Sequence, residues 1–448
     1  MPSSSKKRRT DGHKATTSSG GGGGKGDDDD ADIESLRAQV KELKEALAVS
    51  ADYQSTLYSS GLAARDPRTM AGIPERGMNA RHVRDMLHGI HSLNNEPSLN
   101  TSSYVNVTSE AEETELSNLG ATVNIADASV YPAAVAIHDK CVDFIAGMWH
   151  CPEPPADPST GVKPRHYSGS GTVGSTEACL LAGLAHKFRW RRWYAKRNGL
   201  SQEEVLGVRP NLVMTSCFQA AWEKFFRYFD VEPRFVKPSI KDFRVVPEDM
   251  MELCDDKTMA VVGVMGNHYS GAYDPIWEID EHLSRLNEAK GYQIGIHVDA
   301  ASGGFIAPFA DDTPPWDFRL DSVLSISTSG HKFGESICGT GWVVFRRRED
   351  LTEHIAISVS YLGGVCDSLT LNFSRPASSC YVQMYKLVSA KEKLSLYFVV
   401  CLGIFSRHHP CFVSCMIFIR ACSFGWARRD TRTRSATKCR WPPSSATS

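Results

Sequence analysis

The stretch His297-Val298-Asp299-Ala300-Ala301-Ser302-Gly303-Gly304 decides the fold, because it takes an apolar run at residues 294–298 to a charged side chain. A second segment, Ser329-Gly330-His331-Lys332, follows another apolar run at residues 323–326. Short apolar runs bounded by small residues are typical of buried strands. The sequence therefore predicts an aspartate at the end of one buried strand and a lysine after the next.

A carboxylate and an amine in these positions are what pyridoxal 5'-phosphate (PLP) chemistry requires. The lysine holds the cofactor as a Schiff base. The aspartate keeps the pyridine nitrogen protonated, so that the ring can accept electrons from a carbanion. Lys332 could instead lie on the surface and Asp299 could cap a helix. The apolar strand before Lys332 and the small residues after Asp299 favour the cofactor site.

Composition indicates a soluble globular protein with reduced thiols. The 448 residues are 42% hydrophobic and 23% charged, and the net charge of -2 gives no indication of nucleic-acid binding. The polar, basic amino terminus does not resemble a secretory signal. The thirteen cysteines show no metal-binding spacing. We therefore expect a cytoplasmic protein that binds neither membrane nor metal.

The chain divides by composition. Residues 1–31 are low in complexity and are expected to be disordered, with Lys6-Lys7-Arg8-Arg9 as a solvated tail or a nuclear signal. Residues 32–50 are expected to form an amphipathic helix that Asp32 can cap, pairing with its copy or docking on the body. Residues 51–130 form an amino-terminal arm with helical patches such as Val83 to Ile90. The apolar positions of the helix at residues 32–50 are Ile33, Leu36, Val40, Leu43 and Leu47.

From Tyr131 onward, helical patterns alternate with short apolar runs, which predicts an α/β domain over residues 131–376. The sheet should be mostly parallel, with helices on both faces. Ligands of such sheets bind at the carboxyl ends of the strands. The expected helices are 133–148, 177–196, 219–229 and 279–289, and the expected strands are 212–214, 260–265, 294–298, 323–326 and 341–345.

A Gly/Ser-rich segment at residues 169–178 opens one of the helical patterns. Glycines let the backbone approach an anion, and a helix amino terminus presents free N–H groups to it. Ser175 and Thr176 add hydroxyl donors. The segment could also be a flexible turn, but beside Asp299 and Lys332 it is interpreted as a phosphate site. His331, next to Lys332, is a further candidate for phosphate contact.

Together these residues resemble the glutamate decarboxylases, which are group II PLP-dependent decarboxylases of the aspartate-aminotransferase fold (fold type I). The resemblance runs from about Ser103 to Tyr385. Its most specific part is Asn372-Phe373-Ser374-Arg375-Pro376, which follows Tyr361-Leu362-Gly363-Gly364. It implies a seven-stranded type of sheet flanked by helices, with a helical amino-terminal arm.

The resemblance also implies roles for individual residues. Lys332 matches the Schiff-base lysine, and Asp299 matches the partner of the ring nitrogen. Ala301 and Gln219 match the residues beneath and above the ring, where glutamine favours glutamate over aromatic substrates. The other matches are Ser175, Thr176 and His331 for the phosphate, Ser374 for the phosphate of the neighbouring subunit, and Asp127, Ser103 and Tyr104 near the distal carboxylate of the substrate.

The implied reaction is the α-decarboxylation of L-glutamate to 4-aminobutyrate (GABA) and CO2 by a homodimer or higher homo-oligomer. Another acidic or aromatic amino acid is the alternative substrate, and a catalytically inactive truncated paralogue is the alternative protein. One position departs from the family: His268 stands where a threonine is usual. It could alter pH dependence or rate, or merely change the packing.

The resemblance ends after about Tyr385, where the family continues into a small carboxy-terminal domain. Residues 377–448 are therefore expected to be a truncated or aberrant region without that domain's carboxylate-binding arginine. A gene model that reads through an intron near Val388 is one explanation, and a divergent tail is another. A membrane anchor at Leu394 to Phe405 would be short of the roughly twenty residues that a spanning helix needs.

Overall fold

The computed structural model describes residues 33–45, 68, 71–73, 77–97, 109–156, 161–241, 243–310, 312–351, 357–359 and 366–389. The chain divides into two compact units, Met1–Asn95 and Glu96–Ser448. The expected tail at residues 1–31, the cap at Asp32 and the apolar run at Leu394 to Phe405 lie outside the described residues.

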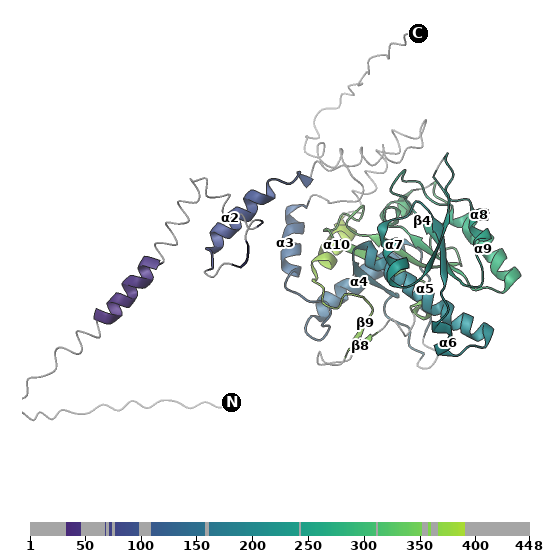
Figure 1. Cartoon of the computed structure of the whole chain (residues 1–448), viewed down its shortest axis with the longest axis horizontal. Helices are drawn as coiled ribbons and strands as arrows, with labels where there is room; N and C mark the ends of the chain where they lie inside the picture. The colour runs from purple at the N-terminus through teal and green to yellow at the C-terminus, as the bar shows by residue number, and fades with distance from the viewer. Residues whose placement is uncertain are drawn as a thin grey trace, which may run out of the picture. The chain divides into compact units, whose positions relative to one another are not determined.

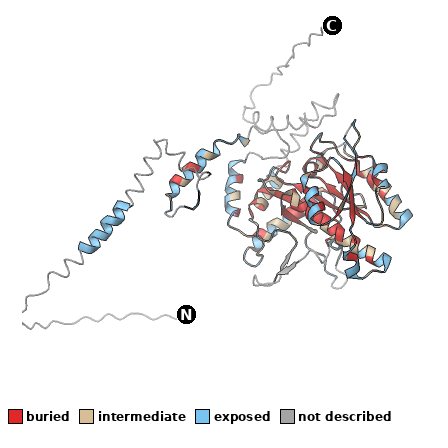
Figure 2. Ribbon diagram, viewed as in Figure 1, coloured by how far each residue is buried: buried red, intermediate tan, exposed pale blue. Residues whose placement is uncertain are grey.

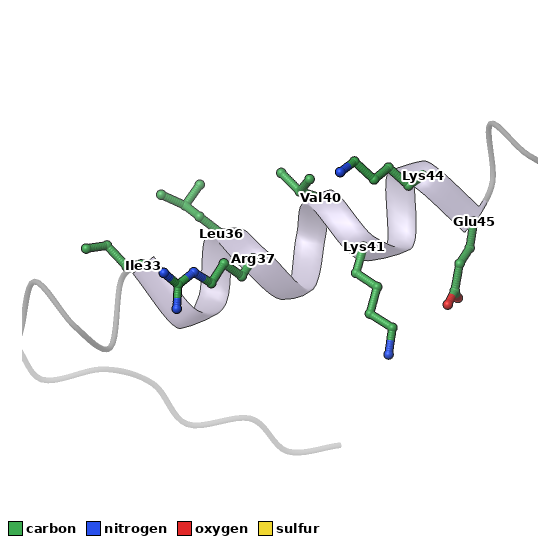
Figure 3. Close-up of a pocket in the computed structure, with 7 residues that line it drawn as sticks. All are labelled: Ile33, Leu36, Arg37, Val40, Lys41, Lys44 and Glu45. Carbon is green, nitrogen blue, oxygen red and sulfur yellow. The ribbon is translucent and has the colours of Figure 1, made fainter.

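The described part of the first unit contains two helices. One spans residues 33–45, within the range expected for the amphipathic helix. Its apolar side chains Ile33, Leu36 and Val40 lie along one side, and Lys41 points away from them (Figure 3). The second helix, α2 (Ala80–His91), covers the helical patch expected in the arm, and Asn79 caps it by accepting from the N–H of Arg81 at 2.9 Å.

The second unit is built on a seven-stranded sheet, which confirms the predicted α/β fold with a mostly parallel sheet. The strand order is β1-β7-β6-β5-β4-β2-β3. Strands β3, β2, β4, β5 and β6 run parallel, and β7 is antiparallel to both of its neighbours. The strands are β1 (Gly169–Val173), β2 (Asn211–Thr215), β3 (Glu232–Val236), β4 (Thr258–Val264), β5 (Gly295–Asp299), β6 (Val323–Ser329) and β7 (Thr340–Phe345).

Both faces of the sheet are covered by helices, because successive side chains of a strand point to opposite faces. On β2 and β4, Val213 and Val261 join a core with α4 (Pro132–Met148) and α9 (Ile276–Lys290). Their neighbours Leu212 and Ala260 join a second core with α5 (Gly174–Asn198) and α7 (Ala220–Tyr228). Figure 2 shows the burial concentrated in the sheet and on the inward faces of these helices.

Shorter elements complete the unit, and Figure 1 shows its helices around β4. Among the described residues no helix is long and apolar enough to cross a membrane. The remaining elements are α3 (Ala111–Gly120), α6 (Gln202–Leu206), α8 (Pro247–Glu252), α10 (Ser378–Ser389), the short 3-10 helices η4 (Gly303–Phe305), η5 (Ala307–Phe309) and η6 (Arg348–Asp350), and the hairpin of β8 (Ile357–Val359) and β9 (Cys366–Ser368).

Two strands and one helix boundary differ from the sequence prediction. Residues 169–173, interpreted as part of a Gly/Ser-rich loop, form strand β1, and helix α5 begins at Gly174 rather than at 177. Strand β3 was not predicted, because Glu232-Pro233-Arg234 interrupts its apolar pattern. It lies at the edge of the sheet, where proline is tolerated.

Strand β7 is held close to the start of helix α5. Gly341 pairs with Thr172 on one side and with Ser329 on the other. A Cβ atom at this glycine would overlap the backbone carbonyl of Gly174. Gly174 itself has a φ of +68°, which favours glycine at the turn between β1 and α5. The absence of side chains at both residues therefore permits the close contact.

We expect Gly341→Ala to destabilise the protein, because the added methyl group meets backbone atoms that cannot rotate away. The free energy of unfolding, measured by urea denaturation, should fall by about 1–3 kcal/mol. Gly147→Ala is the matched control, because a Cβ there meets open space on a helix. That control should be neutral or stabilising, and equal effects of the two changes would contradict the packing argument.

Candidate active site

Several of the predicted functional residues lie at the carboxyl edge of the parallel strands. Asp299 is the last residue of β5. Lys332 follows β6, the neighbour of β5. Gln219 follows β2 and stands at the N-cap position of helix α7, and His268 follows β4. Because these four strands are parallel, their carboxyl ends meet at one edge, where ligands of such sheets bind.

The carboxylate of Asp299 is buried and accepts a hydrogen bond at each oxygen. Trp222 donates its indole N–H to Oδ2 at 2.9 Å, and the backbone N–H of Ala301 donates to Oδ1 at 3.1 Å. Asp299 is only 5% exposed. A buried carboxylate costs little when donors satisfy its oxygens, so this arrangement can keep a negative charge in the interior.

The amine of Lys332 lies beside this carboxylate and is also buried. Lys332 is 8% exposed, and its Nζ donates to the hydroxyl of Ser302 at 3.5 Å. Burial lowers the pKa of Lys332, and the negative charge of Asp299 partly opposes that shift. A lysine of lowered pKa is a better nucleophile towards a carbonyl group.

A candidate anion site adjoins the lysine at the start of helix α5. No side chain of the described residues caps this 25-residue helix. Ser175 is buried and accepts a hydrogen bond from the hydroxyl of Ser329 at 2.7 Å, and Thr176 follows it in the first turn. The N–H of Gly174 donates to the carbonyl of Gly339 at 2.6 Å, so the N–H groups of the residues that follow it and the helix dipole are what would favour a bound anion.

The ring of His331 is oriented by the backbone of β7. Its Nδ1 lies 2.8 Å from the carbonyl oxygen of Thr340, so Nδ1 carries the proton and Nε2 is free to face a ligand. Burial lowers the pKa of His331, and the carbonyl of Thr340 opposes that shift. The ring therefore presents Nε2 to a ligand at this edge of the sheet.

A second cluster joins residues 124–127 to residues 372–375. Asn124 donates to the hydroxyl of Ser374 at 3.1 Å and accepts from the N–H of Arg375 at 3.1 Å. Hydrogen bonds from Ser129 and the backbone of Val130 lower the pKa of Asp127. Among the described residues, no hydrogen bond or ion pair joins this cluster to the catalytic lysine candidate.

Glu177 ties this second cluster to the anion site, and sequence reasoning did not identify it. One of its oxygens accepts from the N–H of Val173 at 2.6 Å and the other from the N–H of Asn372 at 2.8 Å. It is buried at the start of α5. The available signal in the sequence was a charged residue in a helix turn whose other residues are small or apolar. Ser103 and Tyr104, also expected near the substrate, lie outside the described residues.

His268, the departure from the family pattern, projects from a tight hairpin between Gly266 and Gly271. Asn267 shapes this hairpin by accepting from the N–H of Tyr269 at 3.1 Å and of Ser270 at 2.9 Å. Burial lowers the pKa of His268, the charge of Lys332 lowers it further, and Asp299 opposes both. His268 therefore shares the electrostatic field of the candidate site.

A buried lysine coupled to a buried carboxylate at this edge of the sheet, with an uncapped helix beside it, defines the class of PLP-dependent enzymes of fold type I. A family described as "Pyridoxal-dependent decarboxylase conserved domain" matches residues 107–393. The chain belongs to this family. Membership confirms the predicted fold type and the predicted PLP cofactor.

Individual relatives agree with this assignment. The chain is 39% identical to glutamate decarboxylase beta of Listeria monocytogenes over 279 residues, which are 62% of this chain and 57% of that protein. It is 36% identical to the glutamate decarboxylase of Solanum lycopersicum, over 72% and 62% of the two chains. The chain thus spans less than two thirds of the length of these relatives.

A solved structure is similar as well. The glutamate decarboxylase of Lactobacillus brevis superposes with a TM-score of 0.69 at 33% identity, over 77% of this chain and 75% of that one.

We expect Asp299→Asn to make Lys332 of the cofactor-free protein more reactive. Asp299 raises the pKa of Lys332, so removing its charge lowers that pKa and increases the neutral amine at a fixed pH. Labelling of Lys332 by an amine reagent, followed by peptide mass spectrometry, should become several-fold faster. Asp321→Asn is the control, because that carboxylate is fully exposed. Unchanged or slower labelling in Asp299→Asn would contradict the coupling.

Proposed function

We propose that this chain decarboxylates L-glutamate to GABA and CO2 with PLP as cofactor. The observation that carries the proposal is the buried Lys332 amine, whose pKa is lowered by burial beside the doubly hydrogen-bonded carboxylate of Asp299. The 39% identity to a glutamate decarboxylase supports glutamate as the substrate. Another acidic amino acid or an aromatic one is the alternative.

The residues present at the site fit both the phosphate end and the ring end of PLP. A phosphate group suits the uncapped start of α5, where the hydroxyls of Ser175 and Thr176 and the ring of His331 add polar contacts. The lowered pKa of Lys332 suits its reaction with the aldehyde of the cofactor. The carboxylate of Asp299 suits a protonated ring nitrogen. We infer from the family resemblance that Ala301 and Gln219 lie on the two faces of the ring.

The chain's own groups then divide the work of the reaction. Bound PLP supplies a ring that accepts the electron pair left when the carboxylate departs as CO2. Asp299 holds a proton at the ring nitrogen, which keeps the ring electron-poor. Lys332 would hold the cofactor covalently at Nζ, and once the substrate amine has replaced it there, the freed Nζ could carry a proton to the α-carbon. Burial excludes water around both groups and strengthens their electrostatic effect.

We further infer that the protein works as a homodimer or larger homo-oligomer in the cytoplasm. The resemblance assigns Ser374 to the phosphate of the neighbouring subunit, and Asp127, in the same cluster, to the distal carboxylate of the substrate. The hydrogen bonds of Asn124 would hold this cluster in shape. The free thiols of the described cysteines suit a reducing compartment.

Purified protein supplied with PLP should absorb visible light and release GABA and CO2 from L-glutamate. Lys332→Ala should abolish both signals, because it removes the amine that would bind the cofactor aldehyde. Lys290→Ala, at an exposed lysine at the end of α9, should change neither. Preference for L-aspartate or an aromatic amino acid in the same assay would favour the alternative substrate. A bound cofactor without any turnover would contradict the decarboxylase proposal for this chain.

Mixing two inactive variants tests whether Ser374 acts on the neighbouring subunit. Ser374→Glu places a negative charge against the phosphate. Random dimers with Lys332→Ala should then recover about a quarter of wild-type activity, because half of the dimers contain one intact site. No recovery would place Ser374 in its own subunit's site, and an active Ser374→Glu variant would place it outside both sites. The matched control mixes wild type with the double variant that carries both Ser374→Glu and Lys332→Ala. In this mixture, a site shared between subunits predicts a lower residual activity than a site contained in one subunit.

A further inference from the structure

The carboxylate of Asp299 depends on a side chain from a distant part of the sequence. Trp222 lies on helix α7, 77 residues before Asp299, and its indole N–H is 2.9 Å from Oδ2. Trp222 is fully buried. Tryptophan has a single N–H donor and no acceptor, so the indole must donate and the carboxylate must accept in this hydrogen bond. The other oxygen, Oδ1, accepts a hydrogen bond from the backbone N–H of Ala301.

The indole ring is fixed in turn by its neighbours. It packs against His297, with ring centroids 5.4 Å apart, and against Phe225 at 5.9 Å. The ring of His297 is itself fixed, because Ser325 and Ser327 contact its two nitrogens at 2.8 and 3.1 Å. The donor that meets Asp299 is therefore held in place by a packed and hydrogen-bonded layer beneath the site.

We propose that Trp222 is a positioning residue that fixes the charged carboxylate of Asp299 in the orientation required by the pyridine nitrogen of PLP. The proposal rests on the proposed PLP function, but it concerns a residue that does not touch the reacting atoms. A hydrogen bond to a charged group contributes more than one between neutral groups, and an unsatisfied buried oxygen is costly. Without the indole N–H, Asp299 loses both its orientation and part of the stabilisation of its charge.

Trp222→Phe is the direct test, because it removes the N–H and keeps an aromatic ring. The apparent dissociation constant of PLP, measured by absorbance titration of the cofactor-free protein, should rise about tenfold to a hundredfold. Trp316→Phe is the matched control. Trp316 is also fully buried, but its indole nitrogen has no hydrogen-bond partner among the described residues. That control should leave PLP affinity within about twofold, and equal losses in both variants would overturn the proposal.

A pH titration of cofactor binding separates positioning from a merely structural role. Titratable groups that face Asp299 come from four elements: Lys332 after β6, His297 on β5, His268 after β4 and Cys179 on α5. All of these remain in Trp222→Phe. The only change at Asp299 is then the loss of the indole donor that stabilises its charged carboxylate. The loss of PLP on acidification should therefore begin at a higher pH in this variant than in wild type or Trp316→Phe. An identical pH profile would overturn the proposal.

A double-variant cycle with Asp299→Ala tests whether Trp222 acts through Asp299. If it does, Trp222→Phe should weaken PLP binding strongly in the wild-type background and little in the Asp299→Ala background. Equal factors in both backgrounds would mean that Trp222 only supports the fold. Wild-type protein that fails to bind PLP would instead overturn the proposed function, and this proposal with it.

If Trp222→Phe does not fold, a crystal structure of wild-type protein with PLP provides the second measurement. We expect Trp222 Nε1 within hydrogen-bonding distance of Asp299 Oδ2 while the carboxylate faces the ring nitrogen. A carboxylate that has turned away from Trp222 would overturn the proposal.

Discussion

The site depends on the pairing of Gly341 with two strands at once. This residue of β7 is opposite Thr172 of β1 and Ser329 of β6. Because β7 is antiparallel to both, it brings the turn at the start of α5 beside the loop that carries Lys332. Ser175 and Ser329, 154 residues apart in the chain, are hydrogen-bonded as a result. Strand β7, which lies between β1 and β6, therefore brings the candidate anion site and the lysine together.

The apolar runs were sufficient to predict the parallel core and the position of its site. Runs such as 260–265 and 294–298 were found as β4 and β5, and Asp299 ends its strand as expected. Strand β1 could not be found in this way, because its Gly-Ser-Gly-Thr-Val sequence has no apolar run and gains its stability from pairing with β7. Its strand character comes from the fold rather than from local preference.

Sequence patterns also could not predict which residues contact the site residues. Nothing in the sequence around Trp222 indicates a hydrogen bond to a residue 77 positions away. Glu177 likewise meets Asn372 across 195 residues. Spacing along a strand or helix predicts which face a residue occupies. It does not predict which distant side chain meets it there, because that depends on how the helices pack on the sheet.

Polar groups continue into the layer between the sheet and α5. His297 and His186 both contact the hydroxyl of Ser325, at 2.8 and 3.0 Å. Burial lowers the pKa of His297 to about 4, and the charge of Asp299 only partly opposes this. The imidazole is therefore neutral at physiological pH. It supports the indole of Trp222 without adding a positive charge that would compete for the carboxylate of Asp299.

The two hydrogen bonds of Glu177 have a thermodynamic consequence. One carboxylate holds both the turn at the proposed phosphate site and the segment that leads to Ser374. In the proposed dimer, that segment reaches the neighbouring subunit. Cofactor binding and subunit association then become linked equilibria: each strengthens the other by the same factor. Scarcity of the cofactor would therefore appear as dissociation of the oligomer as well as loss of the bound chromophore.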